Sequence, residues 1–444
     1  MSHDKPALRA GRIRYLILCM LFLASSVNYA DRSALSAAQN GLSKRFAIDP
    51  ETLSLVIAAW GWAYVLAQIP SGRLLDRFGA RRVYGLSILL WSLLILLHGF
   101  VSFLPNAGLA FLTLIALSFL VGLAEAPAFP GNGRLVATWF PTRERGTASA
   151  IFNSSQYFAT VLFVPLMGYV AQTFSWPWVF WTMGAFGLLL TALWFKTVYG
   201  PRNHPWVRPT EITYIQQGGA LIDPVPRQSA ARSGWFYTRQ LLTNRMLLGV
   251  YIGQYCITTL TYFFVQWVLP YLVNERRMSL LNAGFIAALP ALCGFAGGVL
   301  GGILSDFLLR RGFSLTTSRK TPIILGMIAA TAIVACNYVD SDGFIVAILC
   351  FAFFGKGLGA LGWTVVSDTS PKEVLGLCGG IFNMIGNSSQ ITLAYVVGSL
   401  VKGTGNFHLV LLFVAAHALL AIIAYTFIVG PIKRVELNAN PAPQ

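Results

Sequence analysis

The sequence is poor in charged residues, and poorest in acidic ones. Only 11% of its 444 residues are charged, with 16 Asp and Glu against 32 Lys and Arg, while 56% are hydrophobic. This composition excludes an ordinary soluble domain. We therefore expect an all-α protein whose helices cross a membrane many times.

Residues typical of enzyme chemistry are also scarce. The six cysteines fall within apolar stretches, where each acts as a small apolar filler, so no disulfide framework is predicted. His98, His204, His408 and His417 form no cluster, and the sequence has no GxxxxGK, HExxH or Cys/His metal spacing. We therefore expect neither ATP hydrolysis nor metalloenzyme chemistry, and no cofactor or metal site.

Twelve apolar stretches are long enough to cross a bilayer, which takes about 20 residues in a helix. They cover residues 14–36, 52–72, 83–104, 108–131, 146–171, 176–197, 247–273, 281–305, 321–339, 343–367, 375–400 and 407–430. The first follows basic residues, as in a signal peptide, but it carries Asp31 and Arg32 and has no small-residue cleavage site. We interpret it as a retained helix.

The net charge of +16 is unevenly distributed. Basic residues gather before the first stretch and after the second, fourth and eighth. The loops on the opposite side hold only five basic residues: Lys44, Arg45, Arg276, Arg277 and Lys402. This asymmetry follows the positive-inside rule, so it predicts cytoplasmic termini and argues against a nucleic-acid partner.

A short motif recurs at a constant offset along the chain. Gly72 and Asp76 follow the second stretch, and Gly302 and Asp306 follow the eighth with the same spacing between them. The offset from Gly72 to Gly302 also relates Gly146 to Gly376 and residues 151–153 to 381–383, both Ile-Phe-Asn. The stretches therefore form two six-helix halves in the same orientation, which places a substrate site near the midplane between them.

The predicted organisation is an N-terminal tail (1–13), an N-terminal half (14–197), a connecting loop (198–244), a C-terminal half (245–430) and a C-terminal tail (431–444), with both tails and the loop cytoplasmic. The repeated glycine turn with basic residues resembles the loop signature of the major facilitator superfamily, and the resemblance covers the whole chain. It implies twelve transmembrane helices in two halves. We expect the turn residues to act in gating: Gly72, Asp76, Arg77, Arg81, Gly302, Asp306 and Arg310.

Glu125 is a carboxylate inside an apolar run. It lies nine residues before Arg134, or about 13 Å at ~1.5 Å per residue, too deep for a glutamate to reach water. A functional role is the default for such a residue, and a protonated structural carboxyl is the alternative. Pro127 and Pro130 favour function, because irregular backbone at this depth is tolerated mainly where it is buried in protein or lines a cavity.

Polar residues form stripes on four of the predicted helices. In the first, Ser25, Asn28 and the Asp31-Arg32 pair share a face, and an interfacial ion pair is the alternative for the last two. The other stripes are Asn153, Ser154, Gln156 and Tyr157; Gln254, Thr258 and Tyr262; and Asn383, Asn387 and Gln390. Amides suit a polyhydroxylated ligand, because each offers donors and acceptors, but they also join helices to one another.

Lys356 lies in the middle of the tenth stretch, far along the chain from both Asp342 and Lys372 at its ends, so its reach to water is doubtful. It needs an anion, which is either a structural partner, Glu125 or Asp368, or a carboxylate of the substrate. Trp363 follows seven residues later on the same helical face, where it could give the substrate a stacking wall.

Several motifs together resemble the anion:cation symporters, and among them the bacterial glucarate transporters. They are NYADR (28–32), Tyr64, EAPAFPGN (125–132), IFNSSQY (151–157), GQY (253–255), GKG (355–357) and IFN (381–383), within a match from about residue 12 to 436. The resemblance implies proton-coupled uptake of hexarates such as glucarate and galactarate across the bacterial inner membrane. We expect a monomer whose partners are the sugar-acid anion, protons and membrane lipid.

The resemblance also implies roles for individual residues. Asp31 and Glu125 would be the carboxylates that take up protons, and Arg32 would act on a substrate carboxylate or on Asp31. Substrate contacts are implied for Tyr29, Tyr64, Gln156, Gln254 and Asn383, to which the chemistry of the stripes adds Lys356, Trp363 and Asn387.

Two positions bear on specificity and coupling. The family's galactonate transporters have a neutral residue at the position of Lys356, so a second cation here favours substrates with a carboxylate at each end. The family pattern has an arginine seven residues before the glutamate, where this chain has Ser118. Without a neighbouring cation, a buried Glu125 would favour its neutral form, and coupling would be altered or lost.

The sequence thus predicts an aldarate:proton symporter that works by rocking of its two halves. Three alternatives remain open. They are uptake of another organic anion such as galactonate, a hexuronate or a dicarboxylate; export; and sensing of a sugar acid without transport.

Overall fold

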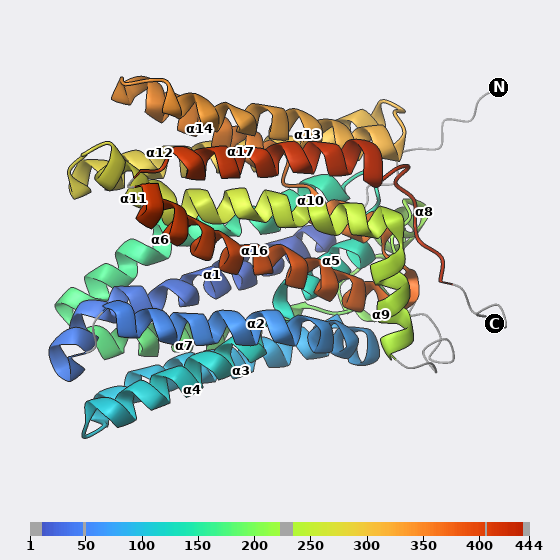
Figure 1. Cartoon of the computed structure of the whole chain (residues 1–444). Helices are drawn as coiled ribbons and strands as arrows, with labels where there is room; N and C mark the ends of the chain where they lie inside the picture. The colour runs from blue at the N-terminus through green and yellow to red at the C-terminus, as the bar shows by residue number, and fades with distance from the viewer. Residues whose placement is uncertain (1–10, 48–49, 223–233, 405, 438–444) are drawn as a thin grey trace, which may run out of the picture.

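The computed structural model describes residues 11–47, 50–222, 234–404 and 406–437. Within these ranges the regular elements are helices, and most of them run along one common axis (Figure 1). Those from the N-terminal part of the chain form one bundle, and those from the C-terminal part form a second bundle beside it. The predicted all-α fold is confirmed.

The first bundle is built from α1 (Ile13–Phe46), α2 (Pro50–Phe78), α3 (Ala80–Phe100), η1 (Val101–Phe103), α4 (Ala107–Glu125), α5 (Ala128–Trp139), α6 (Arg145–Thr173) and α7 (Trp176–Thr197). The connecting segment holds η2 (Pro201–Asn203), α8 (Pro209–Gln217) and α9 (Gly234–Thr243). The second bundle is built from α10 (Arg245–Tyr262), η4 (Phe263–Trp267), α11 (Val268–Pro270), η5 (Tyr271–Glu275), α12 (Leu280–Arg310), α13 (Leu315–Ala330), η6 (Thr331–Asn337), α14 (Asp342–Leu358), α15 (Gly362–Thr369), η7 (Lys372–Val374), α16 (Leu375–Thr404), α17 (His408–Ile423) and η8 (Ala424–Ile428).

Eleven segments of the described chain are long and apolar enough to cross a membrane. Eleven of the twelve predicted stretches correspond to them. The other is α16, which has 30 residues but carries the amides Asn383, Asn387 and Gln390, so it is less apolar than the rest. Its length suffices for a span, since a helix needs about 20 residues.

Two spans are interrupted beside a charged residue. α4 ends at Glu125, and a turn at residues 126–127 separates it from α5. α14 ends at Leu358, half a turn after Lys356, before α15 begins at Gly362. The bend that Pro127 predicts is therefore present, and the second bundle has a corresponding break beside its own charge.

The connecting segment is fastened to the first bundle. Glu211 of α8 is fully buried and accepts the backbone N–H groups of Ile13 and Arg14, at 3.2 and 3.1 Å, at the start of α1. The Tyr214 hydroxyl donates to Glu144 at 2.6 Å, and removal from water together with that carboxylate raises the pKa of Tyr214 to about 12. Parts of the predicted tails and loop, residues 1–10, 223–233 and 438–444, lie outside the described residues.

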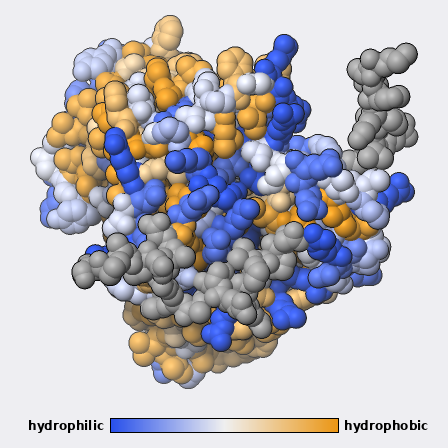
Figure 2. Space-filling model, turned by 90° about the vertical axis from the view of Figure 1, so that its right-hand side faces the viewer, coloured by the Kyte–Doolittle hydropathy of each residue, from blue (hydrophilic) through white to orange (hydrophobic). Residues whose placement is uncertain are grey.

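We call the end of the molecule that holds residues 11 and 437 the closed end. This end is polar, whereas the flanks of the molecule are apolar. Figure 2 views this end, where hydrophilic side chains gather across the middle and hydrophobic ones cover much of the rim. This distribution suits a bundle with its ends in water and its sides in lipid.

Helices α12 and α14 pack through glycine. A Cβ at Gly297 would overlap the backbone carbonyl oxygen of Phe354, and one at Gly301 would overlap that of Leu358. Close approach of backbones is the usual means of packing helices in a membrane, where van der Waals contact replaces the hydrophobic effect between helices.

Gly297→Val should destabilise the second bundle, because the overlapping atom is backbone and cannot rotate away. Overpacking of this kind costs about 1–3 kcal/mol, so we expect a lower midpoint of thermal unfolding in detergent. Gly168→Val is the matched control, since nothing lies within 4 Å of a Cβ at that position of α6. Equal losses in the two variants would contradict the packing argument.

Candidate functional site

A cavity of about 940 Å³ lies between the two bundles. Its mouth, at the end away from the closed end, is lined by exposed residues: Ser36, Ile57, Val265, Gln266 and Leu269. The cavity wall includes every residue assigned above to coupling, to substrate binding or to departure from the family: Tyr29, Asp31, Arg32, Tyr64, Ser118, Glu125, Gln156, Gln254, Lys356, Trp363, Asn383 and Asn387. Their roles stay predictions.

Arg32 is the centre of the charged group in the first bundle. Its Nε lies 3.5 Å from Oε2 of Glu125, and its Nη2 donates to Asn28 at 2.9 Å. Its guanidinium also lies 4.6 Å from the ring centre of Trp60 and 4.9 Å from that of Tyr64. Aromatic faces attract cations, most strongly where water is excluded, so the guanidinium is held on several sides.

This arrangement corrects two expectations. Arg32 pairs with Glu125, and in the described chain Asp31 forms no ion pair, so the alternative of an Asp31–Arg32 ion pair is not the one found in this conformation. Glu125 does have a neighbouring cation, although Ser118 stands where the family has an arginine. Asp31 is 4% exposed, and its Oδ1 has no hydrogen-bond partner among the described residues.

Lys356 faces the cavity from the second bundle. It is 2% exposed, and its Nζ lies 5.3 Å from the ring centre of Phe353. Neither structural anion proposed for it is its partner, because Glu125 is paired with Arg32 and Asp368 with two other arginines. Within the part of the chain that the structure describes, Lys356 has no ion pair, which leaves a substrate carboxylate as its candidate anion.

The amide stripes form hydrogen bonds across the cavity. Asn383 donates to the Tyr64 hydroxyl at 2.9 Å and to Gln68 Oε1 at 3.0 Å, so it joins α16 to α2. Asn387 donates to Asn383 Oδ1 at 2.9 Å and accepts from the Tyr262 hydroxyl at 2.6 Å. The alternative of contacts between helices therefore holds for these residues in this conformation.

Gln156 and Gln254 are less constrained. Each donates to a neighbour on its own helix, Gln156 to the Asn153 carbonyl oxygen at 3.0 Å and Gln254 to the Thr258 hydroxyl at 3.1 Å. Neither bond joins the two bundles, so both amides can turn to a ligand at little cost.

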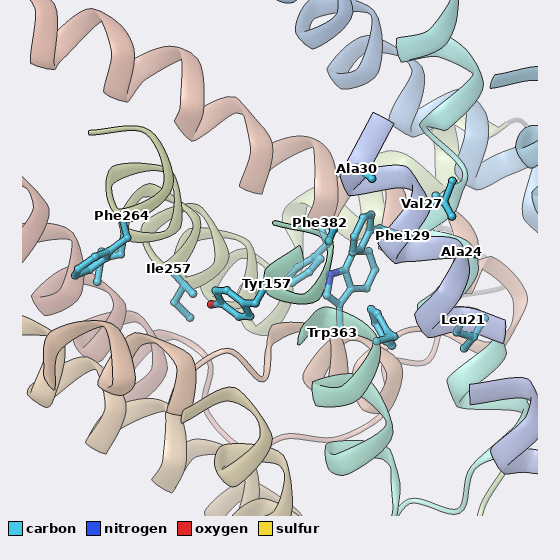
Figure 3. Close-up of a cluster of buried hydrophobic side chains, with 14 of the residues drawn as sticks. Leu21, Ala24, Val27, Ala30, Phe129, Tyr157, Ile257, Phe264, Trp363 and Phe382 are labelled. Carbon is cyan, nitrogen blue, oxygen red and sulfur yellow. The ribbon is translucent and has the colours of Figure 1, made fainter. Parts of the chain in front are cut away.

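Aromatic side chains form the inner wall of the cavity. Figure 3 shows Phe129, Trp363 and Phe382 gathered between the bundles. The Phe129 and Trp363 rings are stacked at 6.1 Å, and Trp363 meets Phe382 edge-on at 4.9 Å. Phe129 and Trp363 are the second residues of α5 and α15, so the two interrupted spans meet at this wall.

Two residues of the wall were missed from the sequence. Trp60 donates its indole N–H to Glu125 at 3.1 Å. His98 Nε2 lies 3.3 Å from the Ser118 hydroxyl, while its Nδ1 lies 2.8 Å from the Leu94 carbonyl oxygen. The helical spacing of Trp60 with Tyr64 could have suggested the first, whereas nothing local distinguishes His98.

Carboxylates of each bundle cap helices of the other at the closed end. Asp76 of α2 accepts the N–H groups of Gly376 and Leu377 at 2.7 and 2.8 Å, where α16 begins. Asp306 of α12 accepts those of Gly146 and Thr147 at 3.0 and 2.7 Å, where α6 begins. A carboxylate at a helix N-terminus satisfies free N–H groups and opposes the helix dipole.

The glycines of the repeated motif allow these caps. A Cβ at Gly72 would overlap the carbonyl oxygen of Gly376, and one at Gly302 would lie 2.6 Å from that of Gly146. Asp76 pairs with Arg134 rather than with an arginine of its own turn. Among the other turn residues, Arg81 donates to the Phe195 carbonyl oxygen at 2.8 Å within its own bundle, and Arg77 and Arg310 are exposed.

A buried charge cluster lies beside these caps. Asp368 accepts from Arg145 at 2.8 Å and from Arg319 at 2.8 Å, and Arg319 also binds Asp306 at 2.9 Å. Arg145 belongs to the first bundle and the other three residues to the second. Among the described residues, the cluster therefore joins the two bundles at this end of the molecule, opposite the mouth of the cavity.

No group of three or more His, Cys, Asp or Glu in the described ranges could hold a metal ion. The arrangement is instead that of a membrane transporter, with two matched bundles, a charged cavity between them and one end closed by contacts across the seam. The chain belongs to the Major Facilitator Superfamily, whose family profile matches residues 21–338.

Similar proteins narrow this assignment. The probable galactarate/D-glucarate transporter GudP of Bacillus subtilis (strain 168) is 55% identical over 435 residues, which cover 98% of this chain and 95% of that protein. GudP of Escherichia coli (strain K12), with the same description, is 51% identical over 96% of this chain and 95% of its own length. A D-galactonate transporter of Escherichia coli O6:H1 is 38% identical over 97% of this chain and 98% of its own length. The chain is thus a transporter and not an enzyme.

Solved structures agree on the fold. The proton:xylose symporter XylE bound to 6-bromo-6-deoxy-D-glucose matches with a TM-score of 0.73 over 94% of this chain and 96% of its own, at 13% identity. The Escherichia coli fucose:proton symporter FucP matches with a TM-score of 0.69 over 94% of this chain and 99% of its own, at 12% identity. The predicted major facilitator fold is confirmed.

Asp368→Asn should loosen the closed end, because it leaves Arg145 buried without its anion. Breaking a buried pair in this way costs about 3–5 kcal/mol. We expect a water-soluble maleimide to label Cys378 about tenfold faster or more, since Cys378 is fully buried next to Leu377, which Asp76 caps. Labelling is quantified by mass spectrometry of the Cys378 peptide.

The control is Asp342→Asn, which removes an exposed carboxylate at the start of α14. Unchanged labelling in Asp368→Asn, or an equal rise in the control, would contradict a closing role for the cluster.

Proposed function

We propose that this protein takes up D-glucarate and galactarate together with protons, as a monomer in the bacterial inner membrane with both termini in the cytoplasm. The observation that carries the proposal is the placement of two cations in one cavity, Arg32 on the first bundle and Lys356 on the second. A dianion with a carboxylate at each end can bind both cations and so join the bundles. The names of the similar proteins support the same substrates.

Protons enter the mechanism through Glu125 and Asp31. A proton on Glu125 ends its ion pair with Arg32 and leaves the guanidinium to a substrate carboxylate. Asp31, with a free buried Oδ1, takes up a second proton and reduces the repulsion that the incoming anion meets. Trp60, Tyr29 and Tyr64 keep the guanidinium in place during the exchange.

The other half of the substrate binds the second bundle. Lys356 takes the far carboxylate, Gln254 and Asn387 bind hydroxyl groups, and Trp363 packs against the carbon chain. Gln156 binds a further hydroxyl group from α6 of the first bundle. After the bundles rock, loss of the protons lets Glu125 recapture Arg32, which releases the dianion. Substrate and protons drive this change only because their affinities differ between the two states.

The orientation follows from the charges. If the basic loops face the cytoplasm, the closed end is cytoplasmic and the mouth faces outward, so the structure is the state that accepts external substrate. The proton gradient then drives uptake.

Uptake by proteoliposomes tests coupling. We expect labelled glucarate to accumulate above its external concentration only with an inward proton gradient, because Arg32 supplies the cation that Glu125 needs. Ser118→Arg should not be required for accumulation. If only Ser118→Arg accumulates glucarate, the chain is a coupling-impaired member of the family. If neither variant moves glucarate, the substrate assignment is wrong.

Lys356→Asn tests the choice of a dianion. A hydrogen bond to a charged group contributes about 1.5–3 kcal/mol, so we expect the KM for glucarate to rise about 10- to 100-fold and that for galactonate to change far less. Lys402→Asn, an exposed position near the end of α16, is the control. An equal rise in the KM for both substrates would contradict the role of Lys356. The second candidate is a galactonate transporter, which the 38% identical relative supports.

A further inference from the structure

The two seams between the bundles are built differently beside the cavity. One seam joins α2 to α16 and the other joins α12 to α6. The constant offset of the repeat places Tyr64 and Gln68 of α2 at the positions of Gly294 and Gly298 of α12. Glycine therefore replaces both polar side chains in the second seam.

The α2–α16 seam is bonded at this level. Both N–H groups of the Asn383 amide are used across it, one by Tyr64 Oη at 2.9 Å and one by Gln68 Oε1 at 3.0 Å. A Cβ at Gly380 would overlap the carbonyl oxygen of Gln68, so the backbones are also in contact. Gln68 itself is fully buried.

Among the described residues, the α6–α12 seam has no such hydrogen bonds at the same level. Asn153, the repeat counterpart of Asn383, lines the cavity and forms no side-chain hydrogen bond with the described residues. A Cβ at Gly298 would meet only the Gly357 carbonyl oxygen of its own bundle, at 3.9 Å. Hydrogen bonds between the bundles thus extend further towards the cavity along the α2–α16 seam than along the α6–α12 seam.

We propose that Gln68 is a positioning residue of the transport cycle. Together with Tyr64 it holds the Asn383 amide across the α2–α16 seam, so it stabilises the mouth-open state and withholds both Asn383 donors from substrate until that seam opens. Asn383 then becomes a stronger substrate contact in the other state than in this one. Such a difference is what a ligand needs in order to shift the equilibrium between the states.

The test measures the seam directly by pulsed electron paramagnetic resonance. Spin labels are attached to Arg77→Cys and Lys372→Cys, exposed positions on α2 and just before α16, in the full-length chain with its six native cysteines replaced. Gln68→Leu should raise the ratio of separated to closed seams about fivefold, the factor that a hydrogen bond of about 1 kcal/mol gives. Gln68→Glu keeps an oxygen acceptor, so it should return the ratio to that of the unsubstituted chain.

The matched control is Gln172→Leu, an exposed glutamine near the end of α6, which should leave the distance distribution unchanged. Should Gln68→Leu fail to fold, Tyr64→Phe removes the other acceptor of Asn383 and should raise the same ratio. An unchanged distribution in Gln68→Leu or Tyr64→Phe, or an equal change in the control, would overturn the proposal. The distances are measured without substrate, so this test stands even if glucarate proves to be the wrong substrate.

Discussion

Charged groups far from water must find partners inside the protein, and this constraint governs the whole structure. Among the described residues, the carboxylates at the closed end have partners for their charge, whereas those in the cavity are only partly satisfied. At the closed end, Asp368 is bound by two arginines, and Asp76 and Asp306 each accept two backbone N–H groups of the opposite bundle. In the cavity, one oxygen each of Asp31 and Glu125 has no partner among the described residues. These two carboxylates, whose hydrogen bonds are incomplete, are the ones available to protons.

The interrupted helices explain how such charges are positioned. A continuous helix satisfies its own backbone and offers nothing at membrane depth. Here α4 breaks directly after Glu125 and α14 breaks shortly after Lys356, so each bundle brings one charge to the cavity beside a helix end. The two charges have opposite sign. The repeat thus supplies one architecture twice, and the side chains placed on it make the two bundles chemically different.

The sequence predicted what depends on periodicity and repetition. Apolar length predicted the spans, and the constant offset between the two halves predicted that Asp76 and Asp306 act alike. Depth in an apolar run identified Glu125 and Lys356, and both line the cavity. What could not be predicted is which residues meet across the chain. Arg32 follows Asp31 directly, yet it pairs with Glu125, because successive residues of a helix point in different directions while packing of α1 against α4 brings distant ones together.

The same limit applies to partners that neutralise a charge. Asp368 was one of two candidate anions for Lys356, but packing places it between Arg145 and Arg319. His98 looked like an isolated histidine because Ser118 is 20 residues away in sequence. Sequence can identify a charge that needs a partner, but the fold determines which partner it finds.

The contrast between the two ends also bears on how transport can be reversible. Opening the closed end separates ion pairs, but it does so by admitting water, which solvates the charges and offsets much of the loss. Opening the α2–α16 seam also breaks the amide contact of Asn383 with Tyr64 and Gln68, in which Asn383 and Tyr64 line the cavity. A neutral contact at that level can be broken at modest cost, so a bound substrate has to replace only a few hydrogen bonds for the bundles to exchange positions.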